Sequence, residues 1–147
     1  MPHPSGPAHC TLHVTQYQYN ERGLLKKTIY QAVTGDTGEV ATSQTYDFAG
    51  RLVSSVDENG IETRSAYNAA GQLTGVTLAF DTADATTIQY GYNFAGQLTS
   101  ITDALTHVTR FEYNDAGQQV KKTLPDTTTF EQFGYNAAGN MTSHRLG

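Results

Sequence analysis

The sequence is poor in the residues on which several protein classes depend. Its 147 residues include no tryptophan and one cysteine, Cys10, so no disulfide can form within the chain. No apolar run approaches the roughly 20 residues that a membrane-spanning helix needs. The opening stretch, MPHPSGPAHC, lacks the apolar centre of a secretory signal. A disulfide scaffold is therefore excluded, and we expect no membrane insertion.

Basic residues are also few. Nine lysines and arginines stand against fourteen aspartates and glutamates, which gives a net charge of −5 and an isoelectric point near 5.4. The basic residues are scattered along the sequence, whereas nucleic-acid binding needs a concentrated basic face. We expect no nucleic-acid partner, and the acidic balance favours solubility.

Strand-forming residues dominate in place of helix formers. Threonine occurs 22 times, tyrosine nine times and phenylalanine six times. These branched and aromatic side chains suit a pleated sheet. Fourteen glycines indicate many turns. No stretch shows an apolar stripe at helical spacing, so the composition predicts an all-β protein.

A short motif recurs six times along the chain. Each copy has a tyrosine, then Asn or Asp, then two variable residues and a glycine, and successive tyrosines lie 21 to 27 residues apart. Six copies in register indicate a repeat protein. The tyrosine, Asn or Asp, and glycine of the copies are Tyr19, Asn20 and Gly23; Tyr46, Asp47 and Gly50; Tyr67, Asn68 and Gly71; Tyr92, Asn93 and Gly96; Tyr113, Asn114 and Gly117; Tyr135, Asn136 and Gly139.

The motif predicts a β-hairpin turn. Asn and Asp suit the first position of a type I turn, because their side chains bond the backbone two residues on. The glycine is expected in the left-handed conformation, which produces a hairpin with a bulge. The tyrosine should end the incoming strand, and a leucine two residues after the glycine should begin the outgoing one. These leucines are Leu25, Leu52, Leu73 and Leu98, while Gln119 and Met141 depart from the pattern.

Second turns are expected between the hairpins, at residues 34–38, 57–60, 80–84, 103–106 and 125–128. The predicted fold is thus a tandem array of antiparallel β-hairpins, about six units of about 22 residues, with roughly a dozen strands in one continuous curved or spiralling sheet. We expect residues 1–14 to form a disordered arm rich in Pro and His. Residues 15–147 should form the array, with its last unit truncated, as in a piece of a longer array.

The segments YDFAGRLVSSVDENG and YNAAGQLTGVTLAF are similar to the RHS/YD repeats of bacterial Rhs proteins, insecticidal toxin complexes and teneurins. The resemblance covers residues 15–147. It implies a β-strip that spirals into a hollow shell around a toxin or other cargo polypeptide, in a protein that is secreted or associated with the cell surface. The implied partners are further RHS repeats or that cargo. The self-cleaving core-end segment of bacterial relatives is not recognisable in this sequence, so the resemblance implies no autoproteolysis by this chain.

Several groups of residues have both a functional and a structural interpretation. His3, His9, Cys10 and His13 could ligate a metal, but their spacing matches no closed zinc pattern. The motif tyrosines could stack on sugars, although six equal copies favour packing between hairpins. Carboxylates in or beside turns could bind calcium or catalyse glycoside cleavage, but turn formation explains them more simply. These carboxylates are Asp57, Glu58, Asp81, Asp84, Asp103, Asp115 and Asp126.

No catalytic motif is recognisable, and His107 and His144 have no evident partner in the sequence. We therefore expect a structural repeat segment with no catalytic residues, no cofactor and no metal site. In this interpretation each hairpin buries one face against the next and extends the sheet. The alternative is a surface module that binds glycans or another protein, and a hydrolase has only the scattered carboxylates in its favour. The end strands should offer unpaired backbone groups and promote self-association.

Overall fold

The computed structural model describes residues 14–30 and 40–147, and all regular structure in these residues is β. Twelve strands and no helix are present in this part of the chain, which confirms the predicted fold class. The expected arm and the expected turn at 34–38 lie outside the described residues, apart from Val14. The strands are β1 (Thr15–Tyr19), β2 (Leu25–Tyr30), β3 (Val40–Tyr46), β4 (Leu52–Val56), β5 (Glu62–Tyr67), β6 (Leu73–Leu78), β7 (Thr86–Tyr92), β8 (Leu98–Thr102), β9 (Val108–Tyr113), β10 (Gln119–Thr123), β11 (Phe130–Tyr135) and β12 (Met141–Leu146).

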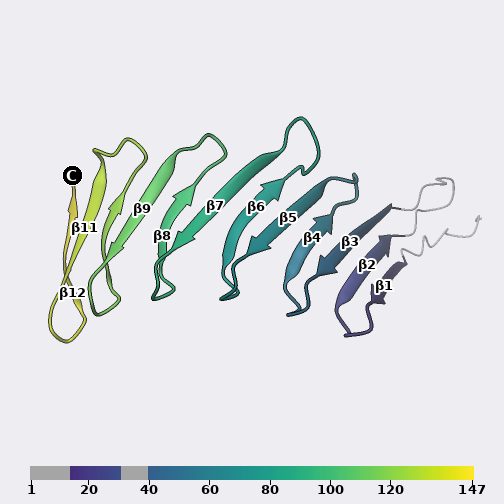
Figure 1. Ribbon diagram of the computed structural model, residues 1–147, viewed down its shortest axis with the longest axis horizontal. Coiled ribbons are helices and arrows are strands. Elements are labelled where there is room, and N and C mark those ends of the chain that lie inside the picture. Colours follow the sequence, from purple (N-terminus) through teal and green to yellow (C-terminus); the bar gives the residue numbers. More distant parts are fainter. Residues whose placement is uncertain (1–13, 31–39) are drawn as a thin grey trace, which may run out of the picture. The chain divides into compact units, whose positions relative to one another are not determined.

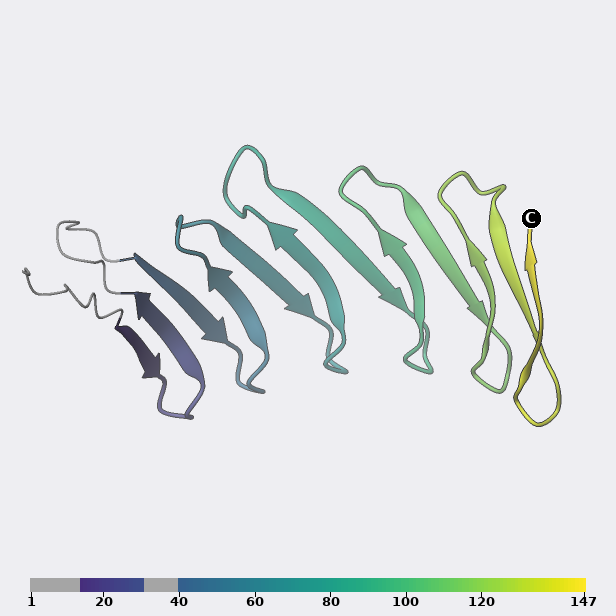
Figure 2. The ribbon, with the colours of Figure 1, turned by 180° about the vertical axis from the view of Figure 1, so that it is seen from behind.

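The chain divides into two units, residues 1–62 and 63–147. In the first unit, strands β1 to β4 lie side by side in the order of the chain. In the second, strands β5 to β12 follow one another in the same way, as Figures 1 and 2 show. Every pairing within the units is antiparallel, so each strand turns back along its predecessor.

The strand boundaries follow the motif. Each incoming strand ends at a motif tyrosine, and each outgoing strand begins two residues after the motif glycine. This holds for β10 and β12 as well, although they begin with Gln119 and Met141 in place of leucine. The turn therefore fixes where each strand begins, whatever side chain stands there.

The fourth motif turn illustrates the geometry. The backbone N–H of Gly96 donates to the carbonyl of Asn93 at 3.0 Å, and the N–H of Asn93 donates to the carbonyl of Gln97 at 3.0 Å. Gly96 has φ of +82°, and all six motif glycines lie between +74° and +83°. The pairing shifts by one residue between Gly91 and Tyr92, which is the bulge that such a turn introduces.

One register recurs in all the hairpins. The residue four places after the motif glycine lies opposite the residue before the tyrosine of its own hairpin, and opposite the residue three places before the tyrosine of the next. Ser100, for example, pairs with Gly91 and with Arg110. Equivalent partners within hairpins are Lys27 and Gln18, Ser54 and Thr45, Gly75 and Ala66, Lys121 and Glu112, and Ser143 and Gly134. Equivalent partners between hairpins are Lys27 and Ser43, Gly75 and Gln89, and Lys121 and Gln132.

The register gives the sheet of the second unit two unlike faces. Tyr90, Tyr92, Ile101 and Phe111 share one face, because paired residues point the same way and neighbours alternate. Polar residues on the opposite face include Gln89, Ser100, Arg110 and Glu112. Strands β7 to β9 thus have an apolar side and a polar side, whereas Lys122, Glu131 and His144 share the face of Phe111 in β10 to β12.

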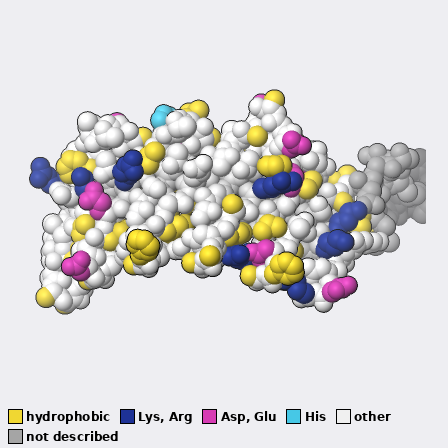
Figure 3. All heavy atoms as spheres, viewed as in Figure 1, with side chains coloured by type: hydrophobic (Ala, Val, Ile, Leu, Met, Phe, Trp, Pro, Cys, Tyr) yellow, Lys and Arg dark blue, Asp and Glu magenta, His cyan; other side chains and the backbone are white. Residues whose placement is uncertain are grey.

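No hydrophobic side chain is buried in the described residues, and the one buried residue is Thr28, with 7% of its surface exposed. The expectation that each hairpin buries a face against the next is therefore wrong. The hairpins within each unit meet edge to edge in a single layer, which leaves both faces partly open to solvent. Figure 3 accordingly shows hydrophobic side chains on the surface, interspersed with polar ones.

We expect Gly71→Ala to lower the free energy of unfolding by about 1–2 kcal/mol, because a Cβ is strained in the left-handed conformation. Gly71 has φ of +83°. Chemical denaturation of the purified chain measures the change.

Gly75→Ala is the matched control. Gly75 lies within β6, and a Cβ there would meet Ile88 O at 3.7 Å and Ala66 Cβ at 3.9 Å, which are ordinary contacts. This variant should be as stable as the parent or slightly more stable. Equal losses in both variants would contradict the turn geometry.

Candidate functional site

The side chain of the Asn or Asp in each motif closes its turn. In the fourth copy, Asn93 Oδ1 accepts hydrogen bonds from the backbone N–H of Ala95 and of Gln97, both at 3.0 Å. The short side chain places its oxygen within reach of these two amides, which is why Asn and Asp serve here. At least one such bond is present in each of the other copies, at Asn20, Asp47, Asn68, Asn114 and Asn136.

A glutamine after the glycine connects one hairpin to the next. Asn93 Nδ2 donates to Gln97 Oε1 at 2.7 Å, and Gln97 Nε2 donates to the carbonyl of Gly117 at 3.2 Å. Gly117 is the glycine of the following motif, so the side chain of one turn bonds the backbone of its neighbour. The same chain of bonds runs from Asn68 through Gln72 to Gly96, and from Asn114 through Gln118 to Gly139.

The second motif uses charged groups at the same two positions. Asp47 Oδ1 accepts from the backbone N–H of Arg51 at 2.9 Å, and Oδ2 accepts from Arg51 Nε at 2.6 Å. The bond from the Arg51 backbone N–H is the largest cause that lowers the pKa of Asp47, and the guanidinium adds to it. At these two positions, an amide side chain pairs with an amide in the fourth motif, and a carboxylate pairs with a guanidinium in the second.

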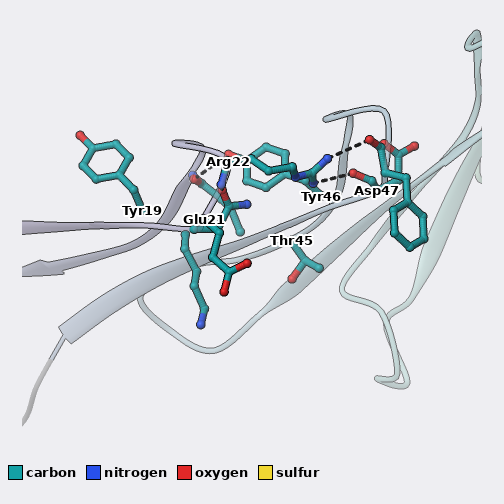
Figure 4. A pocket seen from close by; sticks show the side chains of 10 residues that line it. Tyr19, Glu21, Arg22, Thr45, Tyr46 and Asp47 are labelled. Carbon is teal, nitrogen blue, oxygen red and sulfur yellow. Dashed lines mark hydrogen bonds between the residues drawn. The ribbon is translucent and has the colours of Figure 1, made fainter.

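The first motif reaches its neighbour by a different residue. Leu24 stands where the third, fourth and fifth copies have glutamine, and Arg22 donates instead to the carbonyls of Asp47 and Phe48 at 2.7 and 2.8 Å. Figure 4 shows this guanidinium directed at the second motif turn. It borders an open groove of about 740 Å³ within the first unit. Because the Arg22 side chain is engaged by backbone carbonyls, the groove has no evident catalytic group at that position.

Three motif tyrosines of the second unit bond the preceding hairpin through their hydroxyls. Tyr92 donates to the carbonyl of Leu73 at 2.9 Å, Tyr113 to that of Leu98 at 2.8 Å, and Tyr135 to that of Gln119 at 2.8 Å. In these three copies the acceptor is a backbone carbonyl two residues after the glycine, whereas Tyr46 donates to Gln44 Oε1 on its own strand at 3.3 Å. The side chain at that position can therefore change, which explains how Gln119 replaces leucine without loss of the contact.

Three of the predicted turn carboxylates close turns at the opposite ends of the strands. Asp103 Oδ1 accepts from the backbone N–H of Leu105 and of His107, both at 2.9 Å. Asp57 and Asp126 bond their own turns in a similar way. Thr106 occupies the glycine position of the Asp103 turn with φ of +67°. The remaining candidates, Glu58, Asp81, Asp84 and Asp115, are exposed turn residues.

Both histidines that lacked a partner in the sequence have one in the structure. His107 Nδ1 lies 3.1 Å from Asp103 Oδ2. His144 Nε2 lies 3.2 Å from Glu131 Oε2, and its ring stacks on Phe133 with centroids 5.0 Å apart. The pKa of Glu131 is lowered, chiefly by a hydrogen bond from Lys122 and also by His144.

The described ranges contain no group of three His, Cys, Asp or Glu side chains placed to hold a metal ion. His3, His9, Cys10 and His13 lie outside those ranges. None of the described segments is a helix of the length and apolarity that would cross a membrane. The polar side chains at the motif turns instead bond the backbone of their own turn or of the neighbouring hairpin.

The RHS Repeat family matches the chain at residues 46–83, 92–129 and 113–147, more than half of its length. The chain belongs to this family. The motif turn at Tyr19 lies outside the matched residues but has the same hydrogen bonds. No curated protein matches the RHS repeat chain.

Solved structures similar to the RHS repeat chain contain toxin-complex proteins. A structure of TcdB2-TccC3-Cdc42 aligns with a TM-score of 0.72 at 24% identity, and one of TcdB2-TccC3 without its hypervariable C-terminal region with 0.71 at 23%. The Tc holotoxin pore of Photorhabdus luminescens gives 0.71 at 24%. Each alignment covers 92% of this chain and 8% of the other. The likeness shows a shared fold, and the chain spans a small part of the proteins that it matches.

We expect Tyr92→Phe to lower the free energy of unfolding by about 1 kcal/mol, because the bond to the Leu73 carbonyl is lost. Tyr90→Phe is the control: it lies two residues earlier on the same face, and its hydroxyl has no hydrogen-bond partner among the described residues. Denaturant unfolding of the two variants compares them. Equal stabilities would show that the tyrosine hydroxyl does not connect the hairpins.

Asp103 should make stability depend on acid pH. The hydrogen bond from the His107 backbone N–H is the main cause that lowers the pKa of Asp103 below its ordinary value. A lowered carboxyl pKa stabilises the fold above about pH 4 and loses that contribution as the pH falls through the folded-state value. The Asp103→Asn variant should keep the turn, because Asn93 forms the same turn in the fourth motif. Its stability should fall less steeply than that of the parent as the pH is lowered from about 5 to 2. Thermal melts across this range test it, and parallel curves for parent and variant would contradict it.

Proposed function

We propose that this chain is a structural segment of an Rhs-type shell, which helps to enclose or present a toxin or other cargo polypeptide and has no catalytic activity of its own. The observation that carries the proposal is the repeated contact between hairpins. Register and turn recur from one hairpin to the next in each unit, and the glutamine-to-glycine hydrogen bonds recur in the second unit. A wall built in this way can be lengthened by adding hairpins without a new kind of contact.

The two faces of the sheet suit such a wall. One face carries half-buried aromatic and aliphatic side chains such as Tyr90, Ile101 and Phe111, which can contact the apolar groups of an unfolded polypeptide. The other carries polar residues such as Gln89 and Arg110, which suit water. The fold likeness to TcdB2-TccC3 supports a place in a toxin system, and with it a secreted or cell-surface location.

The polar side chains support a role without chemistry. The carboxylates of Asp47, Asp57, Asp103 and Asp126 are engaged by amides of their own turns. Glu131 is bonded by Lys122 and His144. The four aspartates thus hold the backbone of their turns, and Glu131 joins side chains of neighbouring strands, which supports a structural role for all five.

Protease protection tests the shell. The segment should be expressed within its native reading frame, and the fate of the cargo polypeptide followed by mass spectrometry after protease is added. We expect the cargo to be protected when Gly75→Ala is present, and to be cleaved when Gly71, Gly96 and Gly117 are all changed to Val, because three turns of the wall are then strained. Rapid cleavage of the cargo in the unmodified protein would overturn the proposal.

A glycan- or protein-binding surface is the second candidate. The observation that favours it is a pair of fully exposed rings, Phe48 and Phe94, at the same position of two motif turns. Exposed aromatic rings stack on sugars and anchor protein contacts. A glycan array probed with the chain and with Phe48→Ala/Phe94→Ala distinguishes the candidates. Binding that is lost in the double variant would favour recognition over a wall.

A further inference from the structure

We propose that the sheet of the second unit opens locally from the margin that carries its second turns, while its hairpins stay joined at the margin that carries the motif turns. The second turns of this unit are residues 79–85, 103–107 and 124–129, and each connects one hairpin to the next. Figures 1 and 2 show them along one margin of the sheet, opposite the motif turns. The two margins differ in backbone strain and in the bonds between neighbouring turns.

Backbone strain is concentrated in these second turns. All non-glycine residues with positive φ in the described ranges lie there, namely Ala79, Asp81, Thr106 and Thr127, with φ of +50°, +62°, +67° and +62°. At the position of Thr106 and Thr127, the motif turns have glycine. A β-branched side chain is rarely found in the left-handed region, because its Cβ crowds the backbone. The two threonines therefore hold a conformation that the motif turns avoid by using glycine.

The turn that begins at Asp57 in the first unit shows that glycine fits a second turn. Gly60 has φ of +80°, and its N–H donates to the carbonyl of Asp57 at 3.0 Å. The N–H of Thr106 donates to the carbonyl of Asp103 at the same distance, and both turns are closed by the same two backbone bonds. The turn geometry thus does not require threonine, and Thr106 makes its turn less stable than glycine would.

Bonds between neighbouring turns are found at the motif margin. Gln72, Gln97 and Gln118 each donate to the glycine carbonyl of the next motif turn. Among residues 79–85, 103–107 and 124–129, no hydrogen bond or ion pair joins one second turn to another. The carboxylates of Asp103 and Asp126 bond their own turns instead. Side-chain bonds therefore fix the distance between neighbouring turns at the motif margin alone.

Strain and the lack of bonds between second turns act in the same direction. Local opening begins where the structure is least stable, and a strained turn opens at a lower free-energy cost. A second turn can open without disturbing its neighbours, whereas a motif turn is held by the glutamine of the preceding hairpin. Neighbouring hairpins can then move apart at one margin and remain joined at the other, which changes the curvature of the sheet. The inference concerns the sheet itself and does not depend on cargo enclosure.

Hydrogen exchange of single amides, measured by NMR on the full chain, tests the direction of opening. The amides compared close equivalent turns of neighbouring strands, Asp103 and Thr106 at one margin and Asn93 and Gly96 at the other. We expect protection factors roughly fivefold lower at Asp103 and Thr106, the factor that corresponds to the strain of one left-handed side chain. Equal protection at the two margins, or lower protection at the motif turn, would overturn the proposal.

Thr106→Gly tests the cause of the difference. The variant should raise the protection factor of the Asp103 amide by roughly threefold, because glycine relieves the strain of this turn, and should leave Asn93 and Gly96 unchanged. Ala104→Gly is the matched control, since Ala104 is an exposed residue of the same turn without positive φ, and it should give no increase. An Asp103 amide that exchanges equally fast in the parent and in Thr106→Gly would contradict the inference.

Discussion

Hydrogen bonds between neighbouring hairpins take the place of a hydrophobic core in this protein. No hydrophobic side chain of the described residues is buried, so the sheet cannot rely on burial as a two-layer domain does. Two lateral contacts recur instead, from glutamine to the next glycine carbonyl and from tyrosine to the previous hairpin. Because both contacts end on backbone carbonyls, the side chains around them can vary from one repeat to the next.

The turn makes these contacts possible because it sets the register. A left-handed glycine and a closing Asn or Asp introduce the same bulge in every hairpin, and the two strands of each hairpin then have the same offset. In several turns the side chains at two positions four residues apart are chemically complementary, whereas Leu24 and Ile61 bond the turn through the backbone alone. Asn93 with Gln97, Asp47 with Arg51, and Asp103 with His107 are complementary pairs of different groups. Asp103 and His107 lie in a turn at the other end of the strands, so the same type of turn is found at both ends of the strands.

The sequence predicted much of this fold because its decisive signals are local. The tyrosine and glycine four residues apart located every motif turn. They therefore also located the end of the strand before the turn and the start of the strand after it. The bond from Gln97 to Gly117 and the contact of His144 with Glu131 were missed, since they join residues 20 and 13 positions apart and depend on register. Burial was predicted wrongly because alternation identifies an apolar face without showing whether anything covers it.

The free energy of unfolding of a chain that carries Gln72→Ala, Gln97→Ala and Gln118→Ala together tests the central claim most directly. Each substitution removes a lateral bond to the glycine carbonyl of the next hairpin, at 2.9, 3.2 and 3.1 Å, and with it the exposed bond from the motif asparagine to the glutamine. The account predicts a loss of about 1 kcal/mol for each bond in denaturant unfolding. Gln89→Ala, an exposed strand glutamine on the polar face, should change the value little. A triple variant as stable as this control would contradict the account.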